Sequence, residues 1–201
     1  AKDAVEYIAL MERVVAELEA GKPARGLDLT EEERALLHDL HLITMKPMMY
    51  VVNVDELGAA NENIILEPGV PHIYVCARME AELADLSPAE AADYMKDLGI
   101  AESGLDKIIK AGYGLLNLIT FLTSGEPETR AWTVKKGAKG PEAAGVIHTD
   151  FVKGYVKAEV TTWQDFVELN GWDGEKEKGK MRLEGKEYIV QDGDTVYFHI
   201  A

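Results

Sequence analysis

The sequence predicts a mixed fold in which an α/β segment is followed by an α+β segment. Near the N-terminus, apolar residues recur every three or four positions, which is typical of amphipathic helices. In the middle of the chain, two short runs rich in β-branched and aromatic residues are followed by helical stretches, as in a parallel sheet. From about residue 116 onward, short strands and turns dominate. At 201 residues the chain is long enough for one or two domains.

The composition excludes several classes of protein. A hydrophobic fraction of 47% with 28% charged residues supplies enough apolar surface for a core, so wholesale disorder is excluded. No apolar run approaches the ~20 residues that a membrane span needs. Cys76 is the only cysteine, which rules out an internal disulfide and a cysteine-based zinc cage. We therefore expect a cytoplasmic protein without a membrane partner, and we expect a monomer.

The net charge of −15 argues against a broad surface for nucleic acid, because such surfaces are built from clustered lysine and arginine. The charge is unevenly distributed. Residues 1–124 carry 10 basic and 22 acidic side chains, whereas residues 125–201 carry 11 and 14. If the chain contacts RNA, the C-terminal third is the favoured place, and the contact is local.

The first 42 residues predict two helices. The first carries an apolar stripe and ends at Gly21 and Pro23. Thr30 followed by Glu33 has the spacing of a capping box, so a second helix is expected from about residue 31 to 42. The stripe consists of Val5, Ile8, Met11, Val15 and Leu18. Such a pair suggests a helical hairpin or stalk, and a chain that opens in mid-helix suggests a piece of a longer protein.

The middle segment predicts two strands and two helices. Met48–Val52 and His72–Ala77 do not alternate and are expected to be buried parallel strands. Ser87 followed by Pro88 and Glu90 starts one helix, and Ser103 with Asp106 starts another that reaches about Tyr113.

The last third predicts a compact unit of the β-grasp, ubiquitin-like type. The expected order is two strands, a helix, a strand, a short helix and three strands. These elements are Leu118–Thr123, Arg130–Val134, Glu142–Ile147, Tyr155–Val160, Gln164–Leu169, Met181–Leu183, Glu187–Val190 and Thr195–Ile200.

Polar residues follow the first of the two middle strands, where α/β sheets bind their ligands. Asn53 offers an amide that can bond N7 and an exocyclic group of a purine, and Glu56 offers an acceptor for N–H donors. Guanine-reading proteins have an aspartate and a lysine where Glu56 and Val54 stand, so preference for guanine should be relaxed. The alternative interpretation is an ordinary Asx-turn. Cys76, Ala77 and Arg78 follow the second strand and suggest a second loop of the same site.

A phosphate-binding loop should accompany a purine site. Gly174–Lys180 has the Gly-x4-Gly-Lys spacing, but Met181 follows where a serine or threonine is needed. The stretch is rich in glutamate and lysine and does not join an apolar strand to an apolar helix, so we expect an exposed charged loop. His38 and His41 share a helix face without a third ligand nearby, and no metal site is expected.

Six segments, taken together, resemble a known family. The segments are Lys46–Glu56, Glu102–Asp106, Ala111–Tyr113, Arg130–Thr133, Ala143–Phe151 and Gly179–Asp194. With them, the chain is similar over essentially its whole length to the C-terminal half of the YchF-type, Obg-like P-loop ATPases of the translation-factor class.

This resemblance implies an architecture and a site. Residues 1–42 correspond to the returning part of a helical arm, 43–115 to the distal half of a P-loop nucleotide-binding domain, and 116–201 to a TGS domain of β-grasp type. Asn53, Val54 and Glu56 match a base-recognition motif associated with ATP over GTP, and Cys76, Ala77 and Arg78 match the last nucleotide loop.

The resemblance also implies partners. The parent binds ATP with Mg²⁺ and associates with ribosomes. The phosphate loop is absent from these 201 residues, so we expect the chain alone to be catalytically inactive. Lys135, Lys136 and Lys139 are candidates for contact with RNA or the ribosome. The alternative function is a non-catalytic TGS interaction module that binds RNA or protein.

Overall fold

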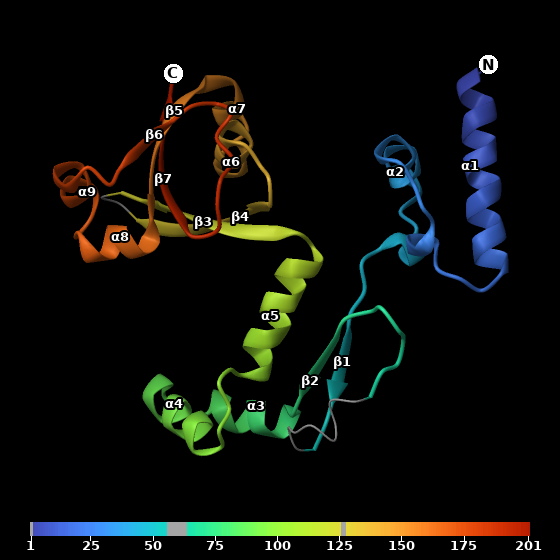
Figure 1. Cartoon of the computed structure of the whole chain (residues 1–201), viewed down its shortest axis with the longest axis horizontal. Helices are drawn as coiled ribbons and strands as arrows, with labels where there is room; N and C mark the ends of the chain where they lie inside the picture. Colours follow the sequence, from blue (N-terminus) through green and yellow to red (C-terminus); the bar gives the residue numbers. More distant parts are fainter. Residues whose placement is uncertain (1, 56–63, 126–127) are drawn as a thin grey trace. The chain divides into compact units, whose positions relative to one another are not determined.

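The computed structural model describes residues 2–55, 64–125 and 128–201, which fall into two compact units divided between Arg78 and Met79 (Figure 1). The first unit begins with helix α1 (Lys2–Glu19), followed by the 3₁₀ turn η1 (Ala24–Gly26) and helix α2 (Glu31–Leu37). Two further 3₁₀ turns, η2 (His38–Leu40) and η3 (Ile43–Met45), lead to the strands β1 (Tyr50–Asn53) and β2 (His72–Val75). No helix in the described ranges is both long and apolar enough to cross a membrane.

The helices of the first unit begin and pack for local reasons. Thr30 Oγ1 accepts the Glu33 backbone N–H while the Glu33 carboxylate accepts that of Thr30, which confirms the predicted capping box. The second helix is shorter than predicted, because His41 takes a left-handed conformation with φ of 47° after the η2 turn. Helix α1 faces the core with a different side from the predicted apolar stripe. The buried core of the first unit consists of Leu10, Val14, Ala24, Leu29 and Leu37.

The predicted apolar stripe of α1 is largely exposed within the described residues. Val5 is 67% exposed and Ile8 is 57% exposed, whereas Leu10 and Val14 are buried. Only Met11, at the edge of the stripe, packs against the core of this unit.

The two predicted middle strands form a parallel pair, as expected. Tyr50 pairs with His72 and Asn53 with Val75. Their burial differs from the prediction, because β1 alternates between half-buried and exposed positions and Val51 is 46% exposed.

Three helices precede the sheet of the second unit, namely α3 (Ala77–Ala84), which begins two residues before the boundary, α4 (Pro88–Asp97) and α5 (Gly104–Leu115). The predicted starts of the last two are confirmed, since Ser87 and Ser103 accept the N–H groups of Glu90 and Asp106. The Glu80 carboxylate of α3 adds two more bonds to the start of α5, from the N–H groups of Gly104 and Leu105.

A five-stranded mixed sheet forms the centre of the second unit. Its strands are β3 (Leu118–Ser124), β4 (Thr129–Lys135), β5 (Tyr155–Thr162), β6 (Arg182–Glu184) and β7 (Asp194–Ile200). The order across the sheet is β4-β3-β7-β5-β6, with β3 and β7 parallel and the other neighbours antiparallel.

Each face of this sheet carries its own pair of helices. On one face, α6 (Gly140–Ile147), followed by α7 (Asp150–Gly154), packs over the core. The helices α8 (Trp163–Glu168) and α9 (Trp172–Lys178) follow β5 (Figure 1). The core contains Phe121, Ala143, Ala144, Val160 and Val196, among others.

Two predictions for the last third are wrong. Glu187–Val190 is not a strand: Ile189 makes one isolated bridge to Lys139, because Tyr188 and Gln191 are engaged by Asp194 in a turn. The stretch from Gly174 to Lys180 is not an exposed charged loop. Most of it belongs to helix α9, and Glu175 within that helix is completely buried.

Candidate functional site

The loops that follow β1 and β2 lie together. Because the strands are parallel and Asn53 pairs with Val75, the chain leaves both strands at the same edge. Asn53 Oδ1 accepts a hydrogen bond from the Ala77 backbone N–H at 3.0 Å, and Cys76 Sγ donates to the Asp55 carbonyl at 3.2 Å. The structure thus joins Asn53 to the second predicted loop.

The hydrogen bond from Ala77 fixes how the Asn53 amide is turned. An N–H donor requires the oxygen, so the side-chain nitrogen keeps both of its hydrogens for another acceptor. This is the arrangement that a purine-reading asparagine needs, because purine N7 is an acceptor.

The neighbouring site residues differ in exposure. Val54 is 8% exposed and its N–H bonds the Val75 carbonyl at 2.8 Å, so this side chain does not cover a ligand. Cys76 is buried, as a small apolar residue would be. Arg78 is exposed in the first turn of α3 and has no ion pair within the described residues. Glu56 lies outside the residues that the structure describes.

The opposite end of the β1–β2 pair is held by polar contacts that the sequence did not reveal. The Tyr50 ring stacks on His72, with 5.1 Å between the ring centroids. Its hydroxyl donates to Glu67 at 3.1 Å, which raises the pKa of Tyr50, and Arg25 pairs with the same carboxylate at 3.3 Å.

The basic residues of the predicted RNA surface are not equivalent. Lys139 Nζ pairs with Glu187 at 2.5 Å, and this bond raises the pKa of Lys139. Lys135 and Lys136 have no ion pair in the described parts of the chain. Both line an open cavity of about 610 Å³ beside α6. Their charges are therefore available to a partner, whereas that of Lys139 is matched locally.

The second basic run, from Lys176 to Arg182, is largely neutralised. Lys176 lies 4.0 Å from Glu159, and Lys180 pairs with Asp165 at 3.3 Å. These acids come from β5 and α8, so the sequence offered no local sign of the pairing.

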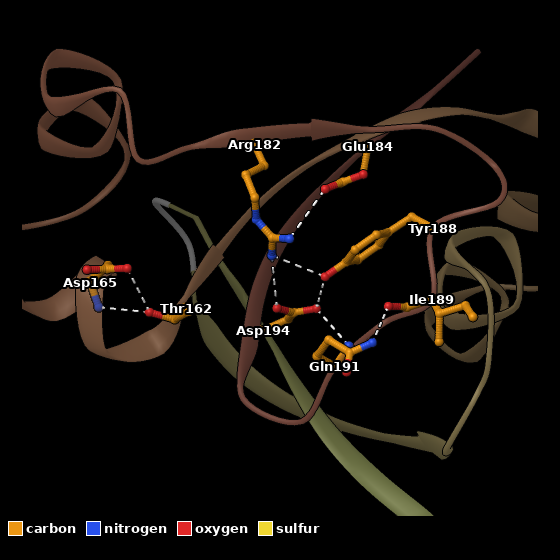
Figure 2. A network of polar contacts seen from close by, with 8 residues as sticks. All are labelled: Thr162, Asp165, Arg182, Glu184, Tyr188, Ile189, Gln191 and Asp194. Atoms are coloured by element: carbon orange, nitrogen blue, oxygen red, sulfur yellow. Dashed lines mark hydrogen bonds and ion pairs between the residues drawn. The ribbon is translucent and has the colours of Figure 1, made fainter.

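Arg182 belongs to a polar network that joins β6, the following turn and β7 (Figure 2). It lies 3.5 Å from Asp194, 3.4 Å from Glu184 and 3.2 Å from the Tyr188 hydroxyl. Asp194, which is 3% exposed, accepts from the Tyr188 hydroxyl at 2.6 Å and from the Gln191 N–H at 2.8 Å. Figure 2 shows Arg182, Tyr188 and Gln191 converging on the Asp194 carboxylate. The network replaces the strand that we predicted at Glu187–Val190.

The network predicts a dependence of stability on alkaline pH. Burial raises the pKa of Tyr188 from 10.0 to about 12, and its bond to Asp194 acts in the same direction. The neutral phenol is favoured in the folded state, so its contribution is complete below pH 10 and is lost as the pH rises from 10.0 to about 12. In the wild type, the denaturant concentration at the unfolding midpoint should fall as the pH rises through this range. We expect this fall to be smaller in Tyr188→Phe. An equally steep loss in the variant would contradict the assignment.

Comparisons with known proteins give three kinds of match. Residues 118–201 match the family model YchF-GTPase_C, described as a protein of unknown function (DUF933). The chain is 47% identical to "Ribosome-binding ATPase YchF" of Bacillus subtilis, over 98% of this chain and 57% of that protein. It is 39% identical to "Obg-like ATPase 1" of Oryza sativa, over 94% of this chain and 50% of that protein.

Solved structures give the same relationship. The Schizosaccharomyces pombe YchF GTPase matches with a TM-score of 0.81 at 35% identity, covering 98% of this chain and 55% of that one. A GTP binding protein from Pyrococcus horikoshii matches at 19% identity with a TM-score of 0.55, which shows a shared fold alone. The chain spans about half the length of the curated relatives it matches. Nearly the whole chain is thus similar to part of the YchF proteins, and its residues 118–201 match the model of the YchF C-terminal domain.

Proposed function

We propose that this chain is the C-terminal part of an Obg-like, YchF-type nucleotide-binding ATPase that prefers ATP to GTP and associates with ribosomes in the cytoplasm. The observation that carries the proposal is the hydrogen bond between Asn53 Oδ1 and the Ala77 N–H. It joins the two base-recognition loops and leaves the Asn53 amide hydrogens as donors. The name of the B. subtilis relative, which describes ribosome binding and ATPase activity, and that of the rice relative, which describes ATPase activity, support the same assignment.

Base selection follows from two side chains. The Asn53 amide donates to purine N7, and its oxygen has a second lone pair for the exocyclic amine of adenine. Guanine instead presents N–H donors at N1 and N2, which a short aspartate reaches best. Glu56 carries a longer carboxylate, so we expect the guanine contact to be weakened. The Val54 side chain is buried, so it does not cover the base, and this residue takes part in the site only through its backbone.

The phosphates and Mg²⁺ need residues that this sequence lacks. No Gly-x4-Gly-Lys string followed by serine or threonine occurs in the 201 residues. We propose that the rest of the parent protein supplies the phosphate loop, and we expect the isolated chain to show no Mg²⁺-dependent ATP turnover above a buffer blank.

The domain assignment is part of the proposal. Residues 1–42 form the arm segment, 43–115 the distal half of the nucleotide-binding domain, and 116–201 a TGS domain. The strand order is β4-β3-β7-β5-β6, and the first and last strands of the segment along the chain, β3 and β7, pair in parallel at the centre of the sheet. This topology supports a β-grasp for the third segment. We propose that the protein is a monomer.

A second candidate function is a TGS interaction module that binds RNA or protein without catalysis. It is favoured by the charges of Lys135 and Lys136, which no described residue pairs. The upstream coding sequence distinguishes the two. A glycine-rich loop ending in Lys-Ser or Lys-Thr supports the ATPase, and a start codon directly before Ala1 supports the module.

The ribosome contact is tested by reversing charge in the full-length protein. We expect Lys135→Glu with Lys136→Glu to reduce co-sedimentation with ribosomes most visibly at low salt, because phosphate contacts release counterions. Lys139→Glu should have a smaller effect, since Glu187 already matches that charge. Lys153→Glu, an exposed lysine on α7, is the control. Unchanged co-sedimentation of the double variant across a salt series would show that this surface is not the contact.

A further inference from the structure

The second unit buries an acidic side chain that has no hydrogen-bond partner in the part of the chain that the structure describes. Glu175 of α9 is 0% exposed, and neither of its carboxylate oxygens has a hydrogen-bond partner within the described residues. The Thr161 and Thr195 hydroxyls are also buried without a partner in the same ranges. These two threonines face each other across β5 and β7.

Contacts on either side of Glu175 show which surface it faces. Trp172 Nε1 donates to the Ser124 carbonyl at 2.9 Å, and its ring lies against that of Tyr197. Lys176 lies 4.0 Å from Glu159. Glu175 is three positions after Trp172 and one before Lys176, so it projects from the side of α9 that meets the sheet.

The strand register places the buried threonines on that same surface. Glu159 pairs with Tyr197, and Thr161 pairs with Thr195 two residues further along. Because side chains two apart on a strand share a face, both threonines lie on the face that α9 covers. This face is opposite to the one that contains Val160 and Val196 of the core.

Residues 163–180, which contain α8 and α9, pack closely against themselves. Lys180 pairs with Asp165 across the segment at 3.3 Å, and Phe166 contacts Trp172 edge to face. A Cβ added at Gly174 would lie 1.9 Å from the Leu169 carbonyl oxygen, so the two helices meet without space for a side chain. These contacts favour movement of the segment as one body.

A buried carboxylate without a partner favours any state in which water reaches it. Within the described residues, the polar and aromatic contacts that hold α9 to the sheet are one indole hydrogen bond, one aromatic contact and one long ion pair. The segment is also anchored at its start, where the Trp163 N–H bonds the Gly193 carbonyl at 3.0 Å. When residues 163–180 separate from the sheet, water reaches Glu175 and both threonine hydroxyls together. The hydrogen bonds between the strands of the sheet remain in place.

We infer that residues 163–180 are a strap that opens from the sheet by local unfolding, and that Glu175 sets how often it opens. Opening uncovers the buried Thr161 and Thr195 on the sheet face that also carries Glu159 and the half-exposed Tyr197. The strap is thus a built-in device that exposes this face transiently without unfolding the unit.

Hydrogen exchange measured by mass spectrometry on the 201-residue chain tests the inference. We expect peptides from 163–180 to exchange at least about tenfold faster than peptides from β5 and β7. Glu175→Ala should slow exchange of the strap by about tenfold or more and raise the melting temperature, because the two buried oxygens without a hydrogen-bond partner are gone. Glu177→Ala, on an exposed position of the same helix, is the matched control and should change neither.

Three results would overturn the inference. In the first, the strap and the sheet exchange at the same rate in the wild type, so that both open only in global unfolding. In the second, Glu175→Ala speeds exchange or lowers the melting temperature, which would mean that the carboxylate stabilises the closed state. In the third, replacing choline by Na⁺ or K⁺ at constant ionic strength protects the strap in the wild type and not in Glu175→Gln. That result would identify a bound cation as the missing partner.

Discussion

Asp194→Ala is expected to lower the free energy of unfolding of the second unit by about 3 kcal/mol, because hydrogen bonds to a charged group contribute about 1.5–3 kcal/mol. The carboxylate is 3% exposed and accepts from the Tyr188 hydroxyl and the Gln191 N–H. Removal of the carboxylate leaves the Tyr188 hydroxyl and the Gln191 N–H without their acceptor, and it removes one of the two acidic partners of Arg182. Tryptophan fluorescence during chemical denaturation measures the change, because all three tryptophans of the chain belong to this unit.

Glu187→Ala is the matched control for this prediction. Glu187 also forms an ion pair, with Lys139, but its side chain is 85% exposed. Exposed pairs contribute at most about 1 kcal/mol, so the unfolding midpoint should hardly move. If Asp194→Ala costs no more than Glu187→Ala, the network in Figure 2 does not hold the 185–194 turn to the sheet.

Asn53→Ala is expected to weaken ATP binding by the full-length protein by about tenfold or more. The loss of a good bidentate base contact costs about 1–3 kcal/mol. The substitution also removes the acceptor of the Ala77 N–H, which joins the two loops. Isothermal titration calorimetry with ATP in the presence of Mg²⁺ measures the effect.

Asn53→Asp separates the two roles of this side chain. The carboxylate still accepts the Ala77 N–H but has no hydrogens to donate to purine N7. We therefore expect Asn53→Asp to bind ATP as poorly as Asn53→Ala while keeping the melting temperature of the wild type. If Asn53→Asp binds ATP normally, Asn53 only joins the loops and does not read the base.

Much of the fold could be predicted because its signals are local. The capping boxes at Thr30 and Ser87, and the β3–β4 hairpin, depend on residues within a few positions of each other. The parallel pairing of β1 and β2 followed from the helical stretch after the second strand. The wrong predictions concern long-range contacts. Asp194 holds a turn where the sequence from Glu187 to Val190 favours a strand.

Helix α9 is a second example of a structure that depends on long-range contacts and could not be predicted from local sequence. Its residues are mostly glutamate, lysine and glycine, which indicate an exposed loop. Tertiary contacts override this pattern, because Trp172 is fixed to Ser124 and Lys176 faces Glu159. A buried Glu175 could not be inferred from a sequence in which its neighbours are charged and exposed.

The candidate site was predictable in place but not in detail. The positions of Asn53 and Ala77 after parallel strands indicated that they would meet, and they do. Burial of Val54 and the pairing of Lys139 with Glu187 depend on partners elsewhere in the fold. The number of lysines in a sequence cluster is therefore larger than the number of positive charges that are left for contact with RNA.

The choice between adenine and guanine nucleotides tests the central claim most directly, since the relatives include one named as an ATPase and another as a GTPase. The measurement is calorimetric titration of the full-length protein with ATP and with GTP under the same Mg²⁺ and salt conditions. We predict that ATP binds about tenfold or more tightly than GTP, and that Glu56→Asp narrows the difference. Equal or tighter binding of GTP by the wild type would contradict the account.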